Sequence, residues 1–280
     1  MTEPPDSVRL DEIGYWSEVK LDIIRDYATE YSKILSNQPR IQHLYIDAFA
    51  GAGTHLSKET GLEVAGSPLI AAQVEPPFSE LHLVDLDGGR AARLRDLSSG
   101  DPRVTVYEGD GNEVLLRHVF PRCRYDQYRR GLCLLDPYGL NVRWEVLRQA
   151  GQMKSIEVFF NFMISDANRN VLWKEPSRVD PVQAARMDLV WGDSSWRQSA
   201  YRTDQDLLGD VTKKQGNDAI AQAFRKRLRD VAGFAHVPQP IPMRNRRGAI
   251  VYYLFFAAQK PVANKIVTHI FDKYRDRGAA

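Results

Sequence analysis

The sequence predicts an α/β protein built on a Rossmann-like, seven-stranded, mainly parallel sheet with a C-terminal β-hairpin. Short apolar runs, typical of buried strands, alternate with helical segments between residues 40 and 161. Two further strand-like runs, around residues 234–243 and 249–258, follow each other closely, as in a hairpin. We expect a single domain over residues 1–280, with a leading helix before the sheet and a helical insertion or lid at residues 162–216. A surface excursion without a role at the site is the alternative for residues 162–216.

The first part of the chain is predicted to hold the leading helix and the first strand–helix unit. Residues 16–36 carry apolar side chains at helical spacing. The apolar run before Asp47 ends in that acid and a glycine-spaced turn, so it reads as the first strand. Ser67 and Pro68 favour the start of the next helix, because serine can cap it and proline fits its first turn. Residues 54–65, between strand and helix, are predicted to form an unusually long loop.

Further strand–helix units follow along the chain. Their strands end in acidic or glycine-containing turns, which can also cap the helices that come next. We predict strands at residues 80–87, 103–107, 131–136 and 156–161, and helices at residues 89–97, 113–120 and 143–151. Beyond residue 216, we predict helices at residues 218–231 and 262–274 on either side of the hairpin.

The composition is that of an ordinary globular protein. The 38 basic and 36 acidic residues nearly cancel, which excludes a global field that drives nucleic-acid binding and leaves local patches possible. Two cysteines, Cys123 and Cys133, are too few for a disulfide framework, so we expect a reduced, cytoplasmic protein. We expect no membrane span, and the N-terminus, with Pro4 and Pro5, lacks the layout of a signal peptide. The six histidines lack metal-ligand spacing, so no metal is expected.

The turn Gly51-Ala52-Gly53 after the first strand is a candidate nucleotide loop. A dinucleotide fingerprint needs a third glycine three residues later, where this chain has Leu56, so NAD is disfavoured. An acid at the strand end, then Phe49 and a short Gly-x-Gly turn, suits S-adenosylmethionine better. Its methionine portion needs a close backbone approach and brings no pyrophosphate to bind. A plain turn is the alternative.

Acidic residues recur at four successive strand ends: Asp47, Asp85, Asp110 and Asp136. Each alone could be a strand terminator or a helix cap. As a set they predict a cofactor site, because the carboxyl ends of parallel strands meet at one edge of the sheet. Asp85 lies where an acid would accept both ribose hydroxyls. Asp110, with Gly111 beside it, suits the adenine amino group, and Asp136 lies where chemistry would occur.

At these residues the chain resembles the class I S-adenosylmethionine-dependent methyltransferases. More narrowly, it looks like the three-Cys-motif partner (TcmP) family. Five stretches carry this resemblance: Trp16-x-x-x-Lys20-Leu21, residues 45–53, residues 66–69, residues 135–139 and residues 161–169. The resemblance implies a methyltransferase-like protein with a radical-S-adenosylmethionine-type partner that bears three clustered cysteines. This chain has no such cluster, so iron–sulfur chemistry would belong to the partner.

The segment Asp136-Pro137-Tyr138-Gly139 resembles the Asp/Asn-Pro-Pro-aromatic segment of amino-group methyltransferases, in which the acid holds the target amine and the aromatic ring stacks on its base. Tyr138 replaces the second proline and Gly139 the aromatic residue, as in tRNA guanine N2-methyltransferases. The resemblance implies that Asp136 and Tyr138 are catalytic and that Pro137 and Gly139 bind substrate. A tight turn at a strand end is the alternative.

Asn168 and Arg169 follow the fifth predicted strand and are placed to face substrate, although a helix cap would also explain the asparagine.

Two basic clusters could contact phosphates or simply be solvated loops. The first cluster surrounds Tyr125 and Tyr128 and consists of Arg122, Arg124, Arg129 and Arg130. The second lies in the predicted hairpin turn and consists of Arg244, Arg246 and Arg247.

Three functions remain open on this sequence. The first is methyl transfer to an amine or other nucleophile of a nucleic-acid component. The second is a cofactor-binding partner or scaffold of the three-Cys-motif protein with little activity of its own. The third is methylation of a protein or small molecule.

Overall fold

The computed structural model describes residues 10–206 and 209–275. Residues 1–9, which include Pro4 and Pro5 of the signal-peptide argument, lie outside the described residues, as do residues 207–208 and 276–280. The contact pattern divides the chain into two compact units, residues 1–136 with 269–280 and residues 137–268. Each unit is described by itself.

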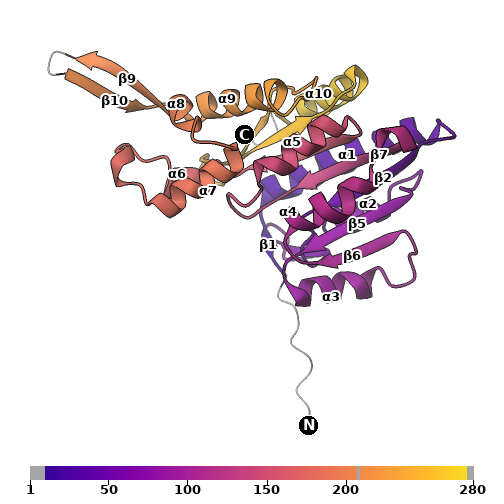
Figure 1. Ribbon diagram of the computed structural model, residues 1–280. Coiled ribbons are helices and arrows are strands. Elements are labelled where there is room, and N and C mark those ends of the chain that lie inside the picture. The colour runs from indigo at the N-terminus through magenta and orange to yellow at the C-terminus, as the bar shows by residue number, and fades with distance from the viewer. Residues whose placement is uncertain (1–9, 207–208, 276–280) are drawn as a thin grey trace, which may run out of the picture. The chain divides into compact units, whose positions relative to one another are not determined.

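Seven strands form one sheet in the order β11-β12-β8-β7-β2-β5-β6 (Figure 1). Their bounds are β2 Gln42–Asp47, β5 Glu80–Asp85, β6 Val104–Glu108, β7 Arg129–Leu135, β8 Ile156–Phe162, β11 Ile241–Arg244 and β12 Ile250–Ala257. In the first unit, β2 pairs in parallel with β5 and β7, and β5 pairs in parallel with β6. In the second unit, β12 runs antiparallel to β8 and to β11. The predicted mainly parallel sheet with a C-terminal hairpin is confirmed.

The helices also match the predicted pattern. The first unit contains α1 Tyr15–Ser36, α2 Ser67–Ala72, α3 Gly88–Leu97 and α4 Gly111–Val114, the last continued by a π-helical turn at Leu115–Val119. The second contains α5 Trp144–Met153, α6 Ile164–Asn170, α7 Pro181–Trp191, α8 Trp196–Ala200 and α9 Asn217–Asp230. Helix α10, Pro261–Arg275, ends the described chain.

Burial explains why the central strands could be recognised in the sequence as continuous apolar runs. Leu44, Tyr45 and Ile46 of β2 are completely buried, and Leu132–Leu135 of β7 are almost as inaccessible. Strands covered on both faces need apolar residues at every position rather than at alternate ones. Helix α1 lies against β2 and α2 and buries Ile23 and Tyr27 there.

The prediction of a long loop at residues 54–65 is wrong. This segment forms the hairpin β3 Thr54–Ser57 and β4 Glu63–Ala65, and β3 pairs in parallel with β1, Glu12–Ile13. Such short strands give no readable periodicity, and β1, which pairs with β3, lies about 40 residues earlier in the chain.

Residues 162–216 contain the expected helices α6, α7 and α8, and in addition the antiparallel pair β9 Tyr201–Asp206 and β10 Gly209–Lys214. In Figure 1 this hairpin extends beyond the helices of its own unit. Trp191 and Trp196 are buried, whereas Trp173 is exposed. Trp191 packs on Phe224 of α9, whose ring also stacks on Phe162 of β8. Two of the three tryptophans of the segment therefore belong to the core of the second unit.

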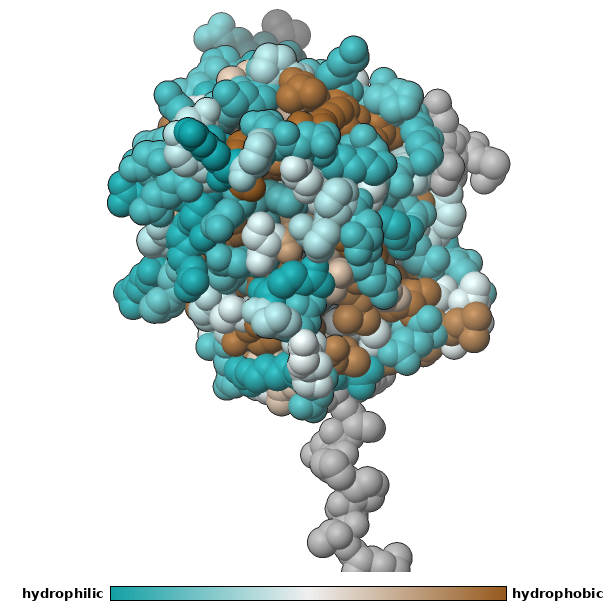
Figure 2. Space-filling model, turned by 90° about the vertical axis from the view of Figure 1, so that its right-hand side faces the viewer, coloured by the Kyte–Doolittle hydropathy of each residue, from teal (hydrophilic) through white to brown (hydrophobic). Residues whose placement is uncertain are grey.

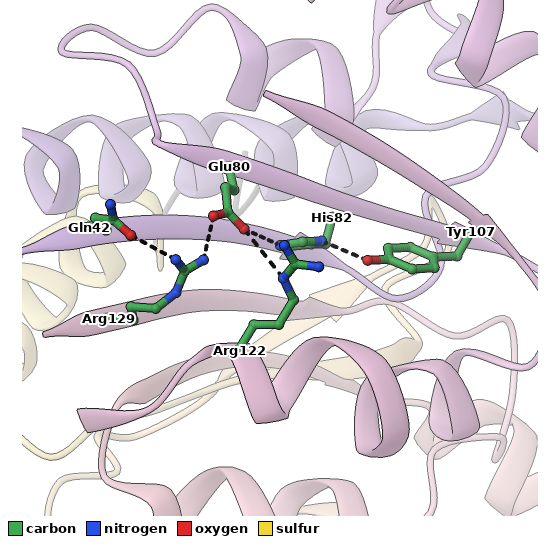
Figure 3. A network of polar contacts seen from close by, with 6 residues as sticks. All are labelled: Gln42, Glu80, His82, Tyr107, Arg122 and Arg129. Carbon is green, nitrogen blue, oxygen red and sulfur yellow. Dashed lines mark hydrogen bonds and ion pairs between the residues drawn. The ribbon is translucent and has the colours of Figure 1, made fainter. Parts of the chain in front are cut away.

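A polar network joins the starts of three parallel strands in the first unit (Figure 3). Arg129 of β7 donates to Glu80 of β5 at 2.5 Å and to Gln42 of β2 at 2.7 Å. The second oxygen of Glu80 lies 3.0 Å from Nε2 of the buried His82, whose Nδ1 lies 3.2 Å from the Tyr107 hydroxyl. This network lies at the end of the strands opposite to the predicted cofactor site.

The face seen in Figure 2 is mainly hydrophilic, with hydrophobic residues in small separate groups. Among residues 10–206 and 209–275, no helix has the length and apolar character needed to cross a membrane. The same residues hold no group of three or more metal-ligating side chains.

Candidate cofactor and acceptor site

Asp47 organises the turn that follows β2. Its side chain is completely buried, and its two oxygens accept three hydrogen bonds. Ser67 Oγ, at the start of α2, donates at 2.6 Å, the Phe49 amide at 3.2 Å and the Tyr45 hydroxyl at 3.4 Å. One carboxylate thus fixes the strand end, the turn and the next helix together.

The environment of Asp47 favours the protonated, uncharged form of its side chain. Burial is the largest influence and raises its pKa to about 7, against the opposing hydrogen bonds from Ser67 and Phe49. The negative charge of Asp136 raises this pKa further, whereas the ammonium of Lys20 lowers it. The charge of this site therefore changes within the physiological pH range.

Asp85, at the end of β5, fastens two turns by their backbone. Its Oδ2 accepts the Gly51 amide at 2.8 Å, and its Oδ1 accepts the Asp87 amide at 2.9 Å. Each carboxylate oxygen can accept a second hydrogen bond, so this bonding is compatible with ribose recognition. The ribose role itself stays a prediction.

The glycines of the first turn have separate structural reasons. Gly51 and Gly53 have φ angles of 66° and 84°, in the left-handed region that favours glycine. A Cβ on Gly53 would lie 3.0 Å from Leu97 Cδ1, so this position is also tightly packed. A Cβ on Gly51 would have only His55 Cε1 near it, at 4.0 Å. The space beside Gly51 is therefore open, as a ligand-binding turn requires.

Asp110 caps α4. Its Oδ1 accepts both the backbone amide and the side-chain amide of Asn112, each at 2.9 Å. A Cβ on Gly111 would lie 2.5 Å from the Ala48 carbonyl oxygen, so this glycine allows close contact between two turns of the protein itself. Helix capping explains Asp110 locally, and the adenine role stays a prediction.

Lys20 was not among the predicted site residues, yet it forms an ion pair with Asp136. Lys20 lies on the buried face of α1, between Val19 and Leu21, and is itself almost inaccessible. A buried lysine is rare unless its charge is paired. Two signals in the sequence could have found it: its place in the stretch Trp16-x-x-x-Lys20-Leu21, and a basic residue on the apolar face of the leading helix.

His55 of β3 is a second residue that sequence reasoning missed. Its Nδ1 is buried and has no hydrogen-bond partner among the described residues. Burial lowers the pKa of His55 below its usual value, and the charge of Lys20 adds to this effect. A buried ring nitrogen without a partner, beside the open Gly51 turn, is a group that a ligand can satisfy.

Leu86 lies between Asp85 and Asp87 and is 75% exposed. A large apolar side chain that is exposed at the carboxyl end of a strand can cover a planar ring. Its position directly after the ribose candidate could have indicated it from the sequence.

In the second unit, the turn after Asp136 exposes Tyr138 and buries the residues on either side of it. Tyr138 is 64% exposed, whereas Pro137 and Gly139 are buried. A Cβ on Gly139 would lie 2.7 Å from Asp166 Oδ2 and 3.2 Å from the Arg186 guanidinium. Gly139 is therefore needed for close packing against α6 and α7.

Asp166 holds this turn in place. Its Oδ2 accepts the Leu140 amide at 2.9 Å and pairs with Arg186 at 2.7 Å, and its Oδ1 accepts from Asn170 at 2.5 Å. Burial tends to raise the pKa of Asp166, but the Leu140 amide, Arg186 and Asn170 together hold it below its usual value. Asp166 lies in the motif at residues 161–169 and was not singled out from the sequence.

Asn168 is engaged within the protein. Its Oδ1 accepts from Lys214 Nζ at 2.8 Å, and its Nδ2 donates to Asn217 Oδ1 at 2.9 Å. Arg169, the next residue, is exposed. Asn168 thus orders the second unit locally, Arg169 is the member of this pair that is exposed, and the substrate role of both stays a prediction.

The predicted site residues fall into two groups. Those predicted for the cofactor lie at the carboxyl ends of β2, β5, β6 and β7 in the first unit: Asp47, Phe49, Gly51, Gly53, Asp85, Asp110, Gly111 and Asp136. The other acceptor candidates lie in the second unit: Pro137, Tyr138, Gly139, Asn168 and Arg169. Asp136, which is predicted for both roles, is the last residue of the continuous part of the first unit.

The basic cluster around Tyr125 and Tyr128 is largely neutralised by its neighbours. Arg129 is bound by Glu80 and Gln42, and Arg124 pairs with Asp126 at 2.6 Å. Arg130 lies over the Tyr125 ring, 3.7 Å from its centre. These contacts favour the structural interpretation of this cluster over a phosphate-binding one.

No family model and no curated protein sequence matches the chain. Among solved structures it is similar to protein LPL1258 from Legionella pneumophila str. Philadelphia 1, with 12% identity over 92% of this chain and 93% of that one, at a TM-score of 0.48. An S-adenosylmethionine-dependent methyltransferase from Mesorhizobium loti has 15% identity over 83% and 99% of the two chains, at a TM-score of 0.37. One from Leishmania major has 10% identity over 86% and 82%, at a TM-score of 0.38.

Proposed function

We propose that the protein is an S-adenosylmethionine-dependent methyltransferase acting on an amine or other nucleophile of a nucleic-acid component. The observation that carries this proposal is the convergence of Asp47, Asp85 and Asp136 on one sheet edge, around a glycine turn whose Gly51 amide donates to Asp85. Carboxylates placed this way suit a ligand with a ribose, an ammonium group and a cationic sulfur.

The residues around the turn fit such a cofactor. The space beside Gly51 is open, His55 Nδ1 lacks a partner among the described residues, and Leu86 exposes an apolar surface. We assign the Asp47 turn and Gly51 to the methionine portion, Asp85 to the ribose, and Leu86 with Asp110 to the adenine. When bound, the cofactor supplies a methyl group on a positively charged sulfur.

Asp136 and Tyr138 are assigned to the acceptor. The Asp136 carboxylate accepts a hydrogen bond from the acceptor N–H, which aligns the nitrogen lone pair and gives the departing proton a base. The exposed Tyr138 ring offers a face on which a planar base stacks. Lys20 compensates the charge of Asp136 and fixes its orientation from α1.

Two measurements test this proposal. Isothermal titration with S-adenosylmethionine and with its demethylated product checks the cofactor, and the absence of binding below millimolar concentrations would remove the basis of the proposal. Transfer of tritiated methyl from the cofactor into fractionated RNA, DNA and protein then identifies the acceptor class. Label that enters only protein, or a small molecule, would contradict a nucleic-acid acceptor.

One observation favours a second candidate function. Lys20 already pairs with the carboxylate proposed to hold the acceptor, as expected of a cofactor-binding protein with little activity of its own. The resemblance to the TcmP family supports a role as partner of a radical-S-adenosylmethionine-type protein with three clustered cysteines. Cofactor binding together with copurification of such a protein, and no methyl transfer to any fraction, would favour this candidate.

A further inference from the structure

Four side chains of the second unit form a surface that the proposed reaction does not yet use. They are Arg169 of α6, Trp173 just beyond it, Tyr201 of β9 and Lys214 of β10, and we call them the α6–hairpin surface. Tyr201 and Lys214 are directly paired across the hairpin, so their side chains lie on the same face of it.

The two cations of this surface have no acidic partner among the described residues. Lys214 Nζ has one hydrogen bond, to the neutral Asn168 Oδ1 at 2.8 Å. Lys214 is half-buried, and burial lowers its pKa below the usual value with no carboxylate nearby to offset this effect. Within residues 10–206 and 209–275, Arg169 makes no side-chain hydrogen bond or ion pair. Both positive charges are therefore available to an external anion.

The aromatic part of the surface is held in position by backbone contacts. Trp173 is 40% exposed, and its indole N–H donates to the Arg169 carbonyl at 2.8 Å. The Tyr201 hydroxyl donates to the Trp173 carbonyl at 2.9 Å. A partly exposed indole whose polar atom is already satisfied presents an apolar face to a ligand.

The other face of the same hairpin differs in charge balance. Arg202 and Lys213, which are paired across β9 and β10, both bind Asp204, at 2.6 Å and 3.2 Å. Two neighbouring lysines of β10 therefore differ: the charge of Lys213 is paired with Asp204 within the hairpin, whereas that of Lys214 has no acidic partner among the described residues. This contrast argues against a uniformly solvated basic hairpin.

We propose that the α6–hairpin surface binds a single-stranded polynucleotide, with Arg169 and Lys214 contacting phosphates and Trp173 stacking on a base. Proteins bind single strands by combining cations for the phosphates with aromatic side chains that stack on the bases, and this surface offers both, whereas the carboxylates of an acidic peptide would engage only the cations. Helix α6 also carries Asp166, which holds the turn that presents Tyr138, so the strand is bound by the helix that positions the acceptor turn. This inference rests on the proposed nucleic-acid acceptor and names its form.

Fluorescence anisotropy with a labelled single-stranded RNA, and with the DNA of the same sequence, tests this proposal on the full chain without cofactor. Arg169→Gln and Lys214→Gln are each expected to weaken binding about tenfold and to reduce the slope of log affinity against log salt by about 0.7. Trp173→Ala is expected to weaken binding about tenfold with the salt slope unchanged. Lys213→Gln is the matched control, because its charge is already paired, and should stay within about twofold of the wild type.

The outcomes separate this inference from the proposed function. Equal effects of Lys213→Gln and Lys214→Gln, or equal competition by poly-glutamate and the oligonucleotide, would overturn the surface proposal. Unchanged oligonucleotide affinity in all three surface variants would also overturn it, even if RNA is methylated. Oligonucleotide binding that depends on these residues, without methyl transfer to any fraction, would support the surface and contradict the proposed reaction.

Discussion

Lys20 and Asp136, 116 residues apart in the chain, form an ion pair that joins α1 to the carboxyl end of β7. The pair lies next to Asp47, whose ionisation both of its members influence. One ammonium therefore compensates two carboxylates at the place where the proposed acceptor is held. A helix outside the sheet thus contributes to the chemistry of the sheet edge.

Replacing Asp136 should separate binding from transfer. Asp136→Asn is expected to lower methyl transfer about 100-fold or more, because the base is lost, while cofactor affinity changes less than about threefold. Tritiated-methyl transfer and isothermal titration measure the two effects.

Lys20→Met should lower the free energy of unfolding by about 2 kcal/mol, and less when Asp136→Asn is also present.

Lys33→Met is the control for the Lys20 variant, because Lys33 lies on the same helix and pairs with Glu30 at the surface. Its expected effect on the free energy of unfolding is below about 0.5 kcal/mol. Purely additive losses in the Lys20 and Asp136 double variant would contradict the coupling of these two residues.

Gly51→Ala and Gly61→Ala make a matched pair. Both glycines have similar positive φ angles, 66° and 69°, so each alanine should cost about 1–2 kcal/mol of stability. Only Gly51 adjoins the proposed cofactor, so only Gly51→Ala should weaken cofactor binding, by about tenfold or more. Isothermal titration of both variants decides, and equal affinities would remove the Gly51 turn from the site.

Gly139→Ala tests the acceptor turn. The added methyl group would lie 2.7 Å from Asp166 Oδ2, which three contacts hold in place, so the turn must shift. We expect methyl transfer to fall about tenfold with cofactor affinity unchanged, because misplacement of reacting groups lowers the rate. Gly14→Ala, where no atom lies within 4 Å of the new methyl group, should transfer normally.

The raised pKa of Asp47 predicts an opposition between stability and binding. The pKa is about 7 in the folded protein and about 4 when unfolded, so the folded state binds the proton more tightly. The free energy of unfolding should therefore fall as the pH rises from about 4 to about 7, by roughly 4 kcal/mol for this group. Affinity for the cationic cofactor should rise over the upper part of that range, as Asp47 becomes charged.

Asp47→Asn should remove the contribution of Asp47 to both pH dependences. Denaturant unfolding and cofactor titration from about pH 5 to about pH 8 measure them. An unfolding free energy of the wild type that runs parallel to that of Asp47→Asn across this range would contradict the shifted pKa.

The Glu80 network predicts a stability effect away from the proposed site. Burial tends to raise the pKa of Glu80, but hydrogen bonds from Arg129 and His82 hold it below its usual value. Its contribution to stability is therefore present above about pH 4.3 and lost as the pH falls through the lowered pKa. Glu80→Gln should cost about 1–3 kcal/mol near neutral pH, measured by denaturant unfolding, with transfer activity retained.

Glu30→Gln, an exposed residue that pairs with Lys33, serves as the control for Glu80→Gln and should change stability by less than about 0.5 kcal/mol. A gap between the two variants that does not narrow below about pH 4 would contradict the network's role.

The sheet was predictable because its strands are short, apolar and buried on both faces. Each of β2, β5, β7 and β8 is such a run, and each ends at a polar or turn-forming segment that periodicity detects. The carboxyl ends of β2, β5, β6 and β7 then indicated the candidate acids. The β9–β10 pair was missed, because its sequence is mainly polar and lacks apolar alternation, and described residues such as Arg202, Thr203 and Lys213 are exposed.

The partners of the site residues were not predictable in the same way. Lys20 belongs to an amphipathic helix, and its ion pair with Asp136 depends on a tertiary contact rather than on local spacing. Asp166 likewise acts on Leu140, 26 residues earlier in the chain. The basic residues around Tyr125 looked free in the sequence, but Glu80, from another strand, binds Arg129.

The short strand β1 gives the start of the described chain a role in shaping the site. The Leu56 amide donates to the Asp11 carbonyl at 3.0 Å, and the Lys58 amide donates to the Ile13 carbonyl at 2.8 Å. These bonds hold the hairpin that carries His55 beside the Gly51 turn. A truncated chain that begins after Ile13 would retain every predicted motif but lose the bonds that hold this hairpin. A shortened version designed from the motifs alone should therefore be less stable and should bind the cofactor weakly.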